Sequence, residues 1–423
     1  MGRGLSAKRS KTPVLKRQRS LSTRIAKMRK SHSEGKPIDF QEDGNESEMS
    51  WATEKDEESI SETDVLTKYK TAARFTNGAL ALALEMCATG GTSLHAVCKA
   101  SDEYIVAKCA TVYLKSVDEN NRPTSKGVAF PTNVSVNNVV CHYTSMNSDY
   151  TLVDGDVVKI HLGCHIDGYP AIAGHTIVVG GAAADPVTAN VIHGAHVACA
   201  AVVRMLHPGE ENGAITDLIE NVAKHFGVEA VEGVLSHRVK RFIVDGQKSI
   251  IGRRQLDAEP RHDTETMEID TNHVYNIDIV FSSGEWKLRP SDAHPTTMYR
   301  RNEVQAPLRM KSARQALMEI RKRFLSFPFV VKDVFPGEVP KSKFGVKSLA
   351  EVGLADPLPV MESKGTAIIA RFSCTVAVTE RTIDVLCGLS PTPNVDVTFP
   401  AALKAILTRP LTHAKATTLT TTD

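Results

Sequence analysis

The sequence contains little of what a secreted or membrane-bound protein requires. No apolar run among its 423 residues approaches the roughly 20 residues of a membrane-spanning helix, and its first residues lack the apolar centre of a signal peptide. The eight cysteines are scattered and form no CxxC pair, which is typical of buried thiols in a reducing compartment. We therefore expect no membrane partner and no disulfide framework.

A large net charge is also missing, because the total is only +2. This balance hides a strong asymmetry. Residues 1–36 hold twelve Lys and Arg with one acid, whereas residues 37–64 hold eleven acids with one base. A basic block followed by an acidic block predicts a disordered tail over residues 1–64. The basic block favours a nuclear or nucleolar location beside a cytoplasmic one, and contact with nucleic acid. The alternative is a solvated tail with no specific role.

The remaining chain has enough apolar residues, 42% of the sequence, for one substantial core. Apolar periodicity, with Thr63 as the first cap, predicts helices at 67–87, from about 92–98, and at 186–206, 215–226 and 310–324. β-rich runs predict strands at 134–142, 156–165, 171–180, 274–282, 366–378 and 382–386, with a loop at 127–133. The Asp167-Gly168 pair predicts a hairpin turn. Helices followed by antiparallel strands, twice over, indicate an α+β fold with two related halves.

Three segments in a fixed order carry a family resemblance. They are Gly127–His142, Asp154–Ile160 and His165–Tyr169. Their order and spacing resemble those of the methionine aminopeptidase/prolidase superfamily, whose fold is called pita-bread. Later segments at 231–237, 274–279 and 281–285 are similar to the eukaryotic proliferation-associated family, homologues of the ErbB-receptor-binding protein. The resemblance covers about Thr67 to Leu389 and implies a pita-bread α+β fold with two pseudo-symmetric halves.

The resemblance also divides the chain into parts. It implies an aminopeptidase-like domain over residues 65–389, in which about 286–355 correspond to the helical insert of type II aminopeptidases. Residues 390–423 follow as a largely irregular C-terminal extension. This extension is rich in Thr, whereas the familiar members of the family end in a long lysine-rich tail. Binding that depends on such a tail therefore does not carry over to this chain.

The active members of the superfamily hold two divalent metals with two Asp, one His and two Glu, because two close cations need several anionic oxygens. The resemblance assigns these positions to His161, Ile172, His237, Asp278 and Ser373. Only His237 and Asp278 keep a ligand of the expected kind. Ile172 offers no donor atom, and Ser373 is a poor ligand. His142 matches a histidine that positions substrate. We call these six residues the relic pocket and expect no metal, no cofactor and no catalytic residue there.

Two alternative functions use the same pocket. His161, His237 and Asp278 could form a two-His–one-carboxylate site, as in a divergent metallo-aminopeptidase. A pocket without metal could instead bind the N-termini of nascent peptides, which would make the protein a peptide-binding adaptor. A cysteine nucleophile is not expected, because neighbouring residues on a strand point to opposite faces and would separate the Cys141 thiol from the His142 ring.

Basic residues crowd two segments after His237, with Trp286 and Tyr299 interleaved as candidate stacking platforms. Such residues bind nucleic-acid phosphates with little sequence specificity. The predicted RNA-binding residues are Arg238, Lys240, Arg241, Lys248, Arg253, Arg254, Lys287, Arg289, Arg300, Arg301, Arg309, Lys311 and Arg314. The second segment falls in the insert, where the family resemblance implies a surface for the large ribosomal subunit near the tunnel exit. We therefore expect a monomeric, non-enzymatic protein of ribosome assembly or translation control, with ribosomal RNA and tunnel-exit ribosomal proteins as partners.

Overall fold

The computed structural model describes residues 59–117, 121–146, 150–181, 185–254, 266–388 and 398–413. All described residues belong to one compact unit, Glu54–Asp423. Residues 1–58 of the tail predicted at 1–64 therefore lie outside the described residues, and its basic block is among them.

A ten-stranded, mostly antiparallel sheet forms the centre of the described fold. Seven strands follow one another in hydrogen-bonded order: β1 (Lys126–Val136), β3 (Val157–Ile166), β4 (Tyr169–Val178), β14 (Ile369–Val378), β8 (His273–Ser282), β6 (Leu235–Val239) and β7 (Ser249–Ile251). Three more strands pair beside this path: β15 (Ile383–Cys387) with β14, β16 (Thr412–His413) with β15, and β5 (Glu229–Ala230) with β8. Central strands such as β3 and β14 are buried along their whole length.

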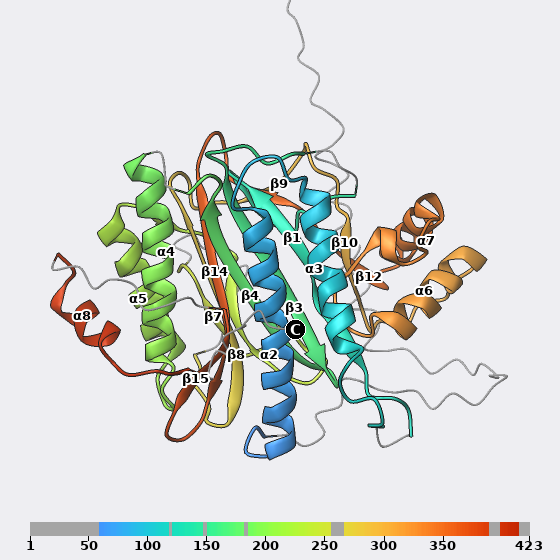
Figure 1. Cartoon of the computed structure of the whole chain (residues 1–423), viewed down its shortest axis with the longest axis horizontal. Coiled ribbons are helices and arrows are strands. Elements are labelled where there is room, and N and C mark those ends of the chain that lie inside the picture. The colour runs from blue at the N-terminus through green and yellow to red at the C-terminus, as the bar shows by residue number, and fades with distance from the viewer. Residues whose placement is uncertain are drawn as a thin grey trace, which may run out of the picture. The chain divides into compact units, whose positions relative to one another are not determined.

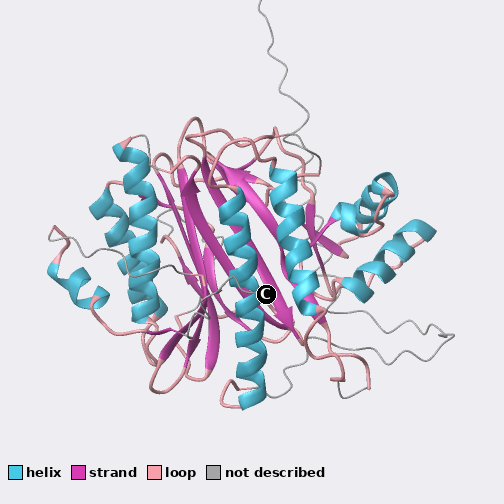
Figure 2. Ribbon diagram, viewed as in Figure 1, coloured by secondary structure: helices cyan, strands magenta, loops and turns pink. Residues whose placement is uncertain are grey.

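Helices cover one face of this sheet (Figures 1 and 2). In one half, α2 (Thr63–Met86) packs on β3 and β4, and α3 (Leu94–Cys109) packs on β1. In the other half, α4 (Pro186–Met205) packs on β8 and β14, and α5 (Asn212–Phe226) packs on α4. This arrangement confirms the predicted α+β fold with two related halves.

Local sequence signals place several of these elements. The side chains of Ser93 and Asp185 cap α3 and α4 by accepting a hydrogen bond from a backbone N–H three residues on. Gly227 ends α5 in the left-handed conformation, with φ 64°. Asp167 and Gly168 have φ 53° and 82°, as a two-residue turn between β3 and β4 requires. The predicted hairpin is therefore confirmed.

A smaller unit lies within residues 286–355 and their immediate surroundings. Strand β10 (Met298–Arg301) pairs with β11 (Phe329–Val330) and β12 (Ala355–Leu358). The 3-10 helix η2 (Val331–Asp333) and helices α6 (Lys311–Arg323) and α7 (Val339–Glu351) complete it. α6 and α7 approach closely at Gly345, where an added Cβ would lie 2.8 Å from Ala316 Cβ. A third sheet joins β2 (Val139–Cys141), β13 (Met361–Glu362) and β9 (Arg289–Pro290).

Two local predictions near the first half are wrong. Thr63 does not cap α2, because it is the first helical residue and Glu62 precedes it without a capping side-chain bond. Residues 127–133 are not a loop but part of β1. Register shifts between Val128 and Asn133 interrupt the pairing of β1 with β3, and such bulges break the alternation by which a strand is identified in a sequence.

One further expectation needs correction in the second half. α4 is long and apolar enough, by length and composition, to cross a membrane, which the sequence was not expected to contain. The helix is largely buried against the sheet, and this burial accounts for its apolar composition. The extension predicted as largely irregular contains the short helix α8 (Ala401–Leu407), which buries Leu403 and Leu407 in the core around α4.

Candidate functional site

Neighbouring strands bring part of the relic pocket together on the sheet face opposite α2–α5. Gly174 of β4 pairs with His161 on one side and with Ser373 on the other. Ser373 pairs in turn with Asp278 of β8. These side chains therefore come from consecutive strands at one level of the sheet. The residues beside them in sequence, such as Leu162, belong to the helix-covered core.

Arg371, which is not one of the family's ligand positions, occupies this site. It lies two residues before Ser373 on β14 and therefore on the same face. Its Nε donates to Oδ1 of Asp278 over 2.8 Å, and its Nη2 donates to Oδ2 over 2.5 Å. The same Nη2 lies 3.5 Å from Nε2 of His161. Arg371 and Asp278 side chains are each 8% exposed, so this two-pronged ion pair is buried.

Burial and the ion pair together determine the protonation of Arg371 and His161. Burial alone would lower the pKa of Arg371, but the charge of Asp278 and the hydrogen bonds to it outweigh burial and raise this pKa. Burial, followed by the charges of Arg371 and His142, lowers the pKa of His161 well below its usual range. His161 is therefore neutral at pH 7. Its Nε2 faces the guanidinium donor, so its buried Nδ1 carries the proton, and that atom has no hydrogen-bond partner among the described residues.

Two of the other relic-pocket positions, Ile172 and Ser373, have lost their ligand character, whereas His237 has not. Ile172 packs in a small apolar cluster with Phe130 and Met298. The Ser373 hydroxyl donates to Oδ1 of Asn276 over 3.2 Å. His237 keeps an imidazole, whose Nδ1 donates to the Gly246 carbonyl oxygen over 3.0 Å.

These side chains do not fit two divalent metals. The family site has four carboxylates, whereas Asp278 is the one acid left among the five ligand positions, and Arg371 holds both of its oxygens. A guanidinium on this carboxylate also opposes a two-His–one-carboxylate site, since a metal there would have to displace the buried cation. Within the described residues, no group of three His, Cys, Asp or Glu side chains has the arrangement to hold a metal.

The Cys141–His142 prediction is wrong. The Cys141 Sγ lies 3.6 Å from the His142 Nδ1, although the two residues are adjacent in sequence. Strand alternation fails at this point because β2 ends at Cys141 and His142 adopts φ 64°, a left-handed conformation. The thiol and the imidazole therefore meet on one side, next to the relic pocket.

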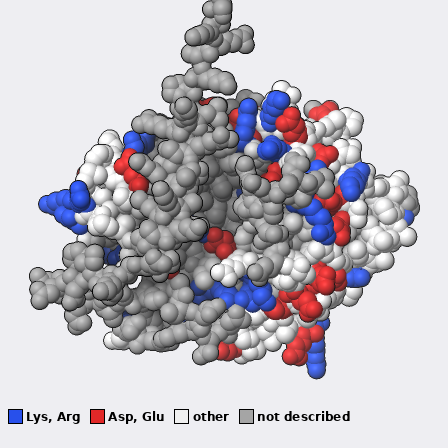
Figure 3. Space-filling view, turned by 180° about the vertical axis from the view of Figure 1, so that it is seen from behind, with Lys and Arg blue, Asp and Glu red and all other residues white. Residues whose placement is uncertain are grey.

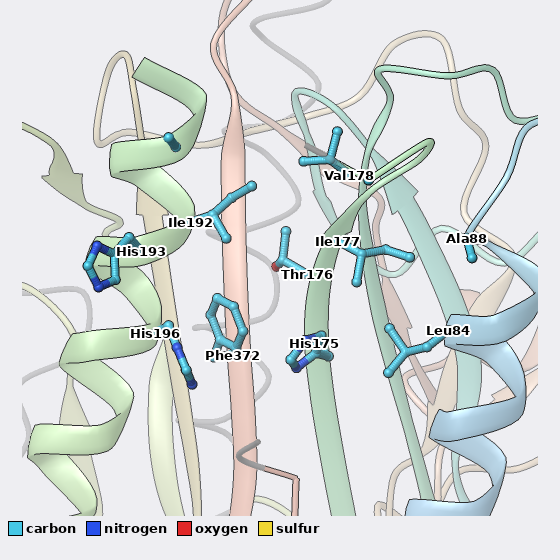
Figure 4. Close-up of a pocket in the computed structure, with 12 residues that line it drawn as sticks. Leu84, Ala88, His175, Thr176, Ile177, Val178, Ile192, His193, His196 and Phe372 are labelled. Atoms are coloured by element: carbon cyan, nitrogen blue, oxygen red, sulfur yellow. The ribbon is translucent and has the colours of Figure 1, made fainter. Parts of the chain in front are cut away.

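A separate cavity of about 660 Å³ lies on the helix-covered face, between α2 and α4 (Figure 4). His175 and His196 lie on either side of Phe372, with ring centroids 5.0 Å from it in both cases. Burial, and then the charge of His196, lowers the pKa of His175 to about 4. Phe372 faces this cavity while its neighbour Arg371 faces the relic pocket. The two sites are thus separated by the sheet.

Eleven of the thirteen predicted RNA-binding residues fall into two groups. Eight of the thirteen form ion pairs with described carboxylates: Arg238 and Lys248 with Asp270, Arg241 with Asp167, Arg253 with Glu229, Arg254 with Asp217, Arg289 with Glu362, Arg300 with Asp245, and Arg301 with Glu303. Arg238 is also buried, 6% exposed, so it cannot reach an RNA phosphate and its prediction is wrong. On the part of the face in Figure 3 that is not grey, basic and acidic atoms lie side by side.

Exposed basic residues without such partners gather on α6 and α7 and just before α6. We call them the insert basic surface: Arg309, Lys311, Arg314, Arg321, Lys322, Lys343 and Lys347. No carboxylate in the described part of the chain forms an ion pair with any of them. Only the first three were among the predicted residues. The others share the sequence signal of Lys and Arg at exposed positions of α6 and α7. Two of the predicted thirteen, Lys240 and Lys287, lie outside both groups.

Comparison with known proteins identifies the class of fold and site. A profile of metallopeptidase family M24 matches residues 67–298. The chain belongs to this family and has its pita-bread fold. Proliferation-associated protein A of Dictyostelium discoideum is 36% identical over 379 residues, which cover 86% of this chain and 95% of that protein. ERBB-3 binding protein 1 of Solanum tuberosum is 35% identical over 325 residues, 76% of this chain and 81% of that protein.

The chain is thus a member of the proliferation-associated branch of the M24 family, as its sequence predicted. A solved structure of a thermophilic Arx1 has the same fold, with a TM-score of 0.70 and 24% identity over 82% of this chain and 99% of that chain.

Proposed function

We propose that the chain is a non-enzymatic RNA- and ribosome-binding protein that acts on the large ribosomal subunit near the tunnel exit, in ribosome assembly or translation control. It would act in the cytoplasm and in the nucleus or nucleolus. Ribosomal RNA, with ribosomal proteins at the tunnel exit, is the proposed partner. The membership of the proliferation-associated branch supports this proposal, and the insert basic surface is the observation that carries it.

The relic pocket supports the proposal that the chain has no aminopeptidase activity. A metallo-aminopeptidase needs metals to generate a hydroxide nucleophile near neutral pH. Here the one remaining acid among the ligand positions, Asp278, is bound through both oxygens by Arg371.

The charge and exposure of the insert support the proposal that it binds the ribosome. Lys311, Arg321 and Lys322 of α6 and Lys343 and Lys347 of α7 are exposed and form no ion pair with a described carboxylate, whereas most of the basic side chains near His237 are matched by carboxylates. Met318 and Phe344, 69% and 54% exposed, lie on the same two helices. Large apolar side chains within a basic surface suit a partner that presents both backbone phosphates and apolar contacts, as a ribosome does.

Charge reversal on α6 tests this proposal. The variant changes Lys311, Arg314, Arg321 and Lys322 to Glu, and leaves out the ion-paired Arg300 and the half-buried Arg301. We expect co-sedimentation with large ribosomal subunits to be lost at moderate salt. If four phosphate contacts disappear, the slope of log affinity against log salt should fall by roughly 3.

A matched control makes the same charge change elsewhere. Lys70, Arg74, Lys108 and Lys115 are exposed on or just after α2 and α3, and their change to Glu should leave binding close to wild type. If the α6 variant sediments with ribosomes as well as the wild type, or if both variants lose binding equally, the insert basic surface is not the interface.

A further inference from the structure

The pair formed by Cys141 and His142 has the geometry of an activated thiol. His142 Nδ1 lies 3.0 Å from the Pro359 carbonyl oxygen, which can only accept, so this nitrogen carries a proton. The Cys141 Sγ is 3.6 Å from the same nitrogen. The proton-bearing edge of the ring is therefore shared between the carbonyl and the sulfur. A thiolate beside such a donor is stabilised by a charge-assisted hydrogen bond.

Charges around the pair favour the ionised form. Burial raises the pKa of the Cys141 thiol and Asp278 opposes ionisation, but the charge and hydrogen bond of His142, with the charge of Arg371, outweigh them, and the pKa is lowered. In return, burial lowers the pKa of His142, and the Cys141 charge and hydrogen bond more than reverse this, so that it is raised. Arg371, which stands at the former metal site, thus supplies positive charge to a neighbouring thiol.

Accessibility separates Cys141 from the other cysteines, all of which lie in the described part of the chain. Cys141 is partly exposed, whereas the remaining seven are buried. Burial raises the pKa of Cys87 and of Cys98 to about 12 and that of Cys387 to about 11. Thiols of this kind are inert at neutral pH. Cys87, Cys98 and Cys387 are therefore internal controls for the reactivity of Cys141.

We propose that Cys141 is a modification site, a thiol activated by His142 that reacts with hydroperoxides and other soft electrophiles. In the peroxide reaction, the thiolate sulfur attacks the terminal oxygen of the hydroperoxide. An S–O bond forms as the O–O bond breaks, sulfur is oxidised by two electrons, and the peroxide is reduced. The departing alkoxide takes the proton of the His142 imidazolium, so the products are a sulfenic acid, an alcohol and neutral imidazole. The proposed reactivity of Cys141 rests on none of the observations that support the proposed ribosome binding.

The position of the pair links the reaction to the insert. Cys141 pairs with Met361 of β13, and Pro359, the partner of His142, directly follows β12 of the insert sheet. A sulfenic acid is larger than a thiol and no longer ionised as the thiolate was. Oxidation would therefore alter the contact that joins the relic-pocket edge to the insert.

Alkylation kinetics test the proposal on the full-length protein. Iodoacetamide labelling of all eight cysteines is followed by mass spectrometry from pH 5 to pH 9. We expect Cys141 to label faster than each of the other seven, with a midpoint below the ordinary thiol value of about 8.5. Addition of hydrogen peroxide should give a dimedone adduct at Cys141 that pretreatment with iodoacetamide prevents.

His142→Asn separates activation from exposure, because Asn tolerates a positive φ and can still donate to Pro359, but cannot carry the charge. The labelling midpoint should rise by at least about one pH unit, with a roughly tenfold slower rate at pH 6.5. The matched control His207→Asn, at an exposed position after α4, should change neither. The proposal is overturned if wild-type Cys141 labels no faster than the buried cysteines, if its midpoint is ordinary, or if no dimedone adduct forms. An unchanged midpoint in a folded His142→Asn variant would overturn the role of His142.

Discussion

Replacing Arg371 by Met should destabilise the protein strongly and in a pH-dependent way. The substitution keeps an unbranched side chain but removes the cation that binds the buried carboxylate of Asp278. Breaking a buried ion pair by removing one partner costs about 3–5 kcal/mol. The carboxyl can escape this cost by binding a proton. From an ordinary pKa of about 3.9, protonation at pH 7 costs about 4 kcal/mol, but at pH 5 only about 1.5 kcal/mol.

The sign of the pH effect follows from linkage. In the variant, the unpaired Asp278 holds a proton in the folded state at a pH where the unfolded chain has already released it. The folded state then binds more protons, so its stability falls as pH rises from about 4 to 7. We expect the loss relative to wild type to grow from about 1.5 kcal/mol at pH 5 to about 4 kcal/mol at pH 7.

Urea unfolding followed by circular dichroism at both pH values measures this difference. The double variant Arg371→Met with Asp278→Asn provides the matched comparison, because it also removes the buried negative charge that the single variant leaves without a partner. It should recover a large part of the stability at pH 7 and lose the pH dependence. A loss below about 1 kcal/mol for Arg371→Met at pH 7, with no difference at pH 5, would show that the guanidinium does not sit on a buried carboxylate.

Three other outcomes follow from the same residues. Purified protein supplied with cobalt, manganese or zinc should release no methionine from short peptides above background; metal-dependent turnover that His237→Ala abolishes would contradict this. Burial lowers the pKa of His165 to about 3, so between pH 3 and 6.5 the unfolded chain binds more protons than the folded protein. For this group, the free energy of unfolding therefore falls as the pH is lowered, by about 2 kcal/mol from neutral pH to pH 5. His165→Gln should flatten the pH dependence of stability, measured by urea unfolding, over that range. Deletion of residues 2–36 should shift a fluorescent fusion from the nucleus to the cytoplasm without lowering its melting temperature.

The main elements of the fold could be predicted because their signals are local. The Asp167-Gly168 turn and the alternating runs around it define one hairpin, and the long apolar stretch at 186–205 defines α4. β1 was predicted only in part, because bulges between Val128 and Asn133 disturb the period of two. The left-handed conformation of His142 was not predictable either, since nothing in its neighbours requires a positive φ.

The ligand positions of the relic pocket were predictable from family resemblance, but its actual content was not. The side chains of Ile172 and Ser373 by themselves indicate that metal ligands have been lost. Arg371 carries only a weak signal, as the single charged residue of the strand Ile369–Val378. Its partner lies on β8, far away in sequence, and is set by the register that pairs Ser373 with Asp278. Pairing across strands depends on the whole sheet, so no local pattern could assign it.

The charge balance of the relic pocket explains why the loss of three carboxylates and the presence of Arg371 depend on each other. Three carboxylate positions have become His161, Ile172 and Ser373, and a guanidinium neutralises the acid that remains. Restoring one carboxylate alone, for example by Ser373→Glu, would add a buried negative charge that Arg371 cannot match while it holds Asp278. The pocket is thus stable as a closed ion pair, with a structural role that does not depend on the insert. Variants at Arg371 should therefore lower stability while leaving the salt slope of ribosome binding unchanged, whereas variants of the insert basic surface should do the reverse.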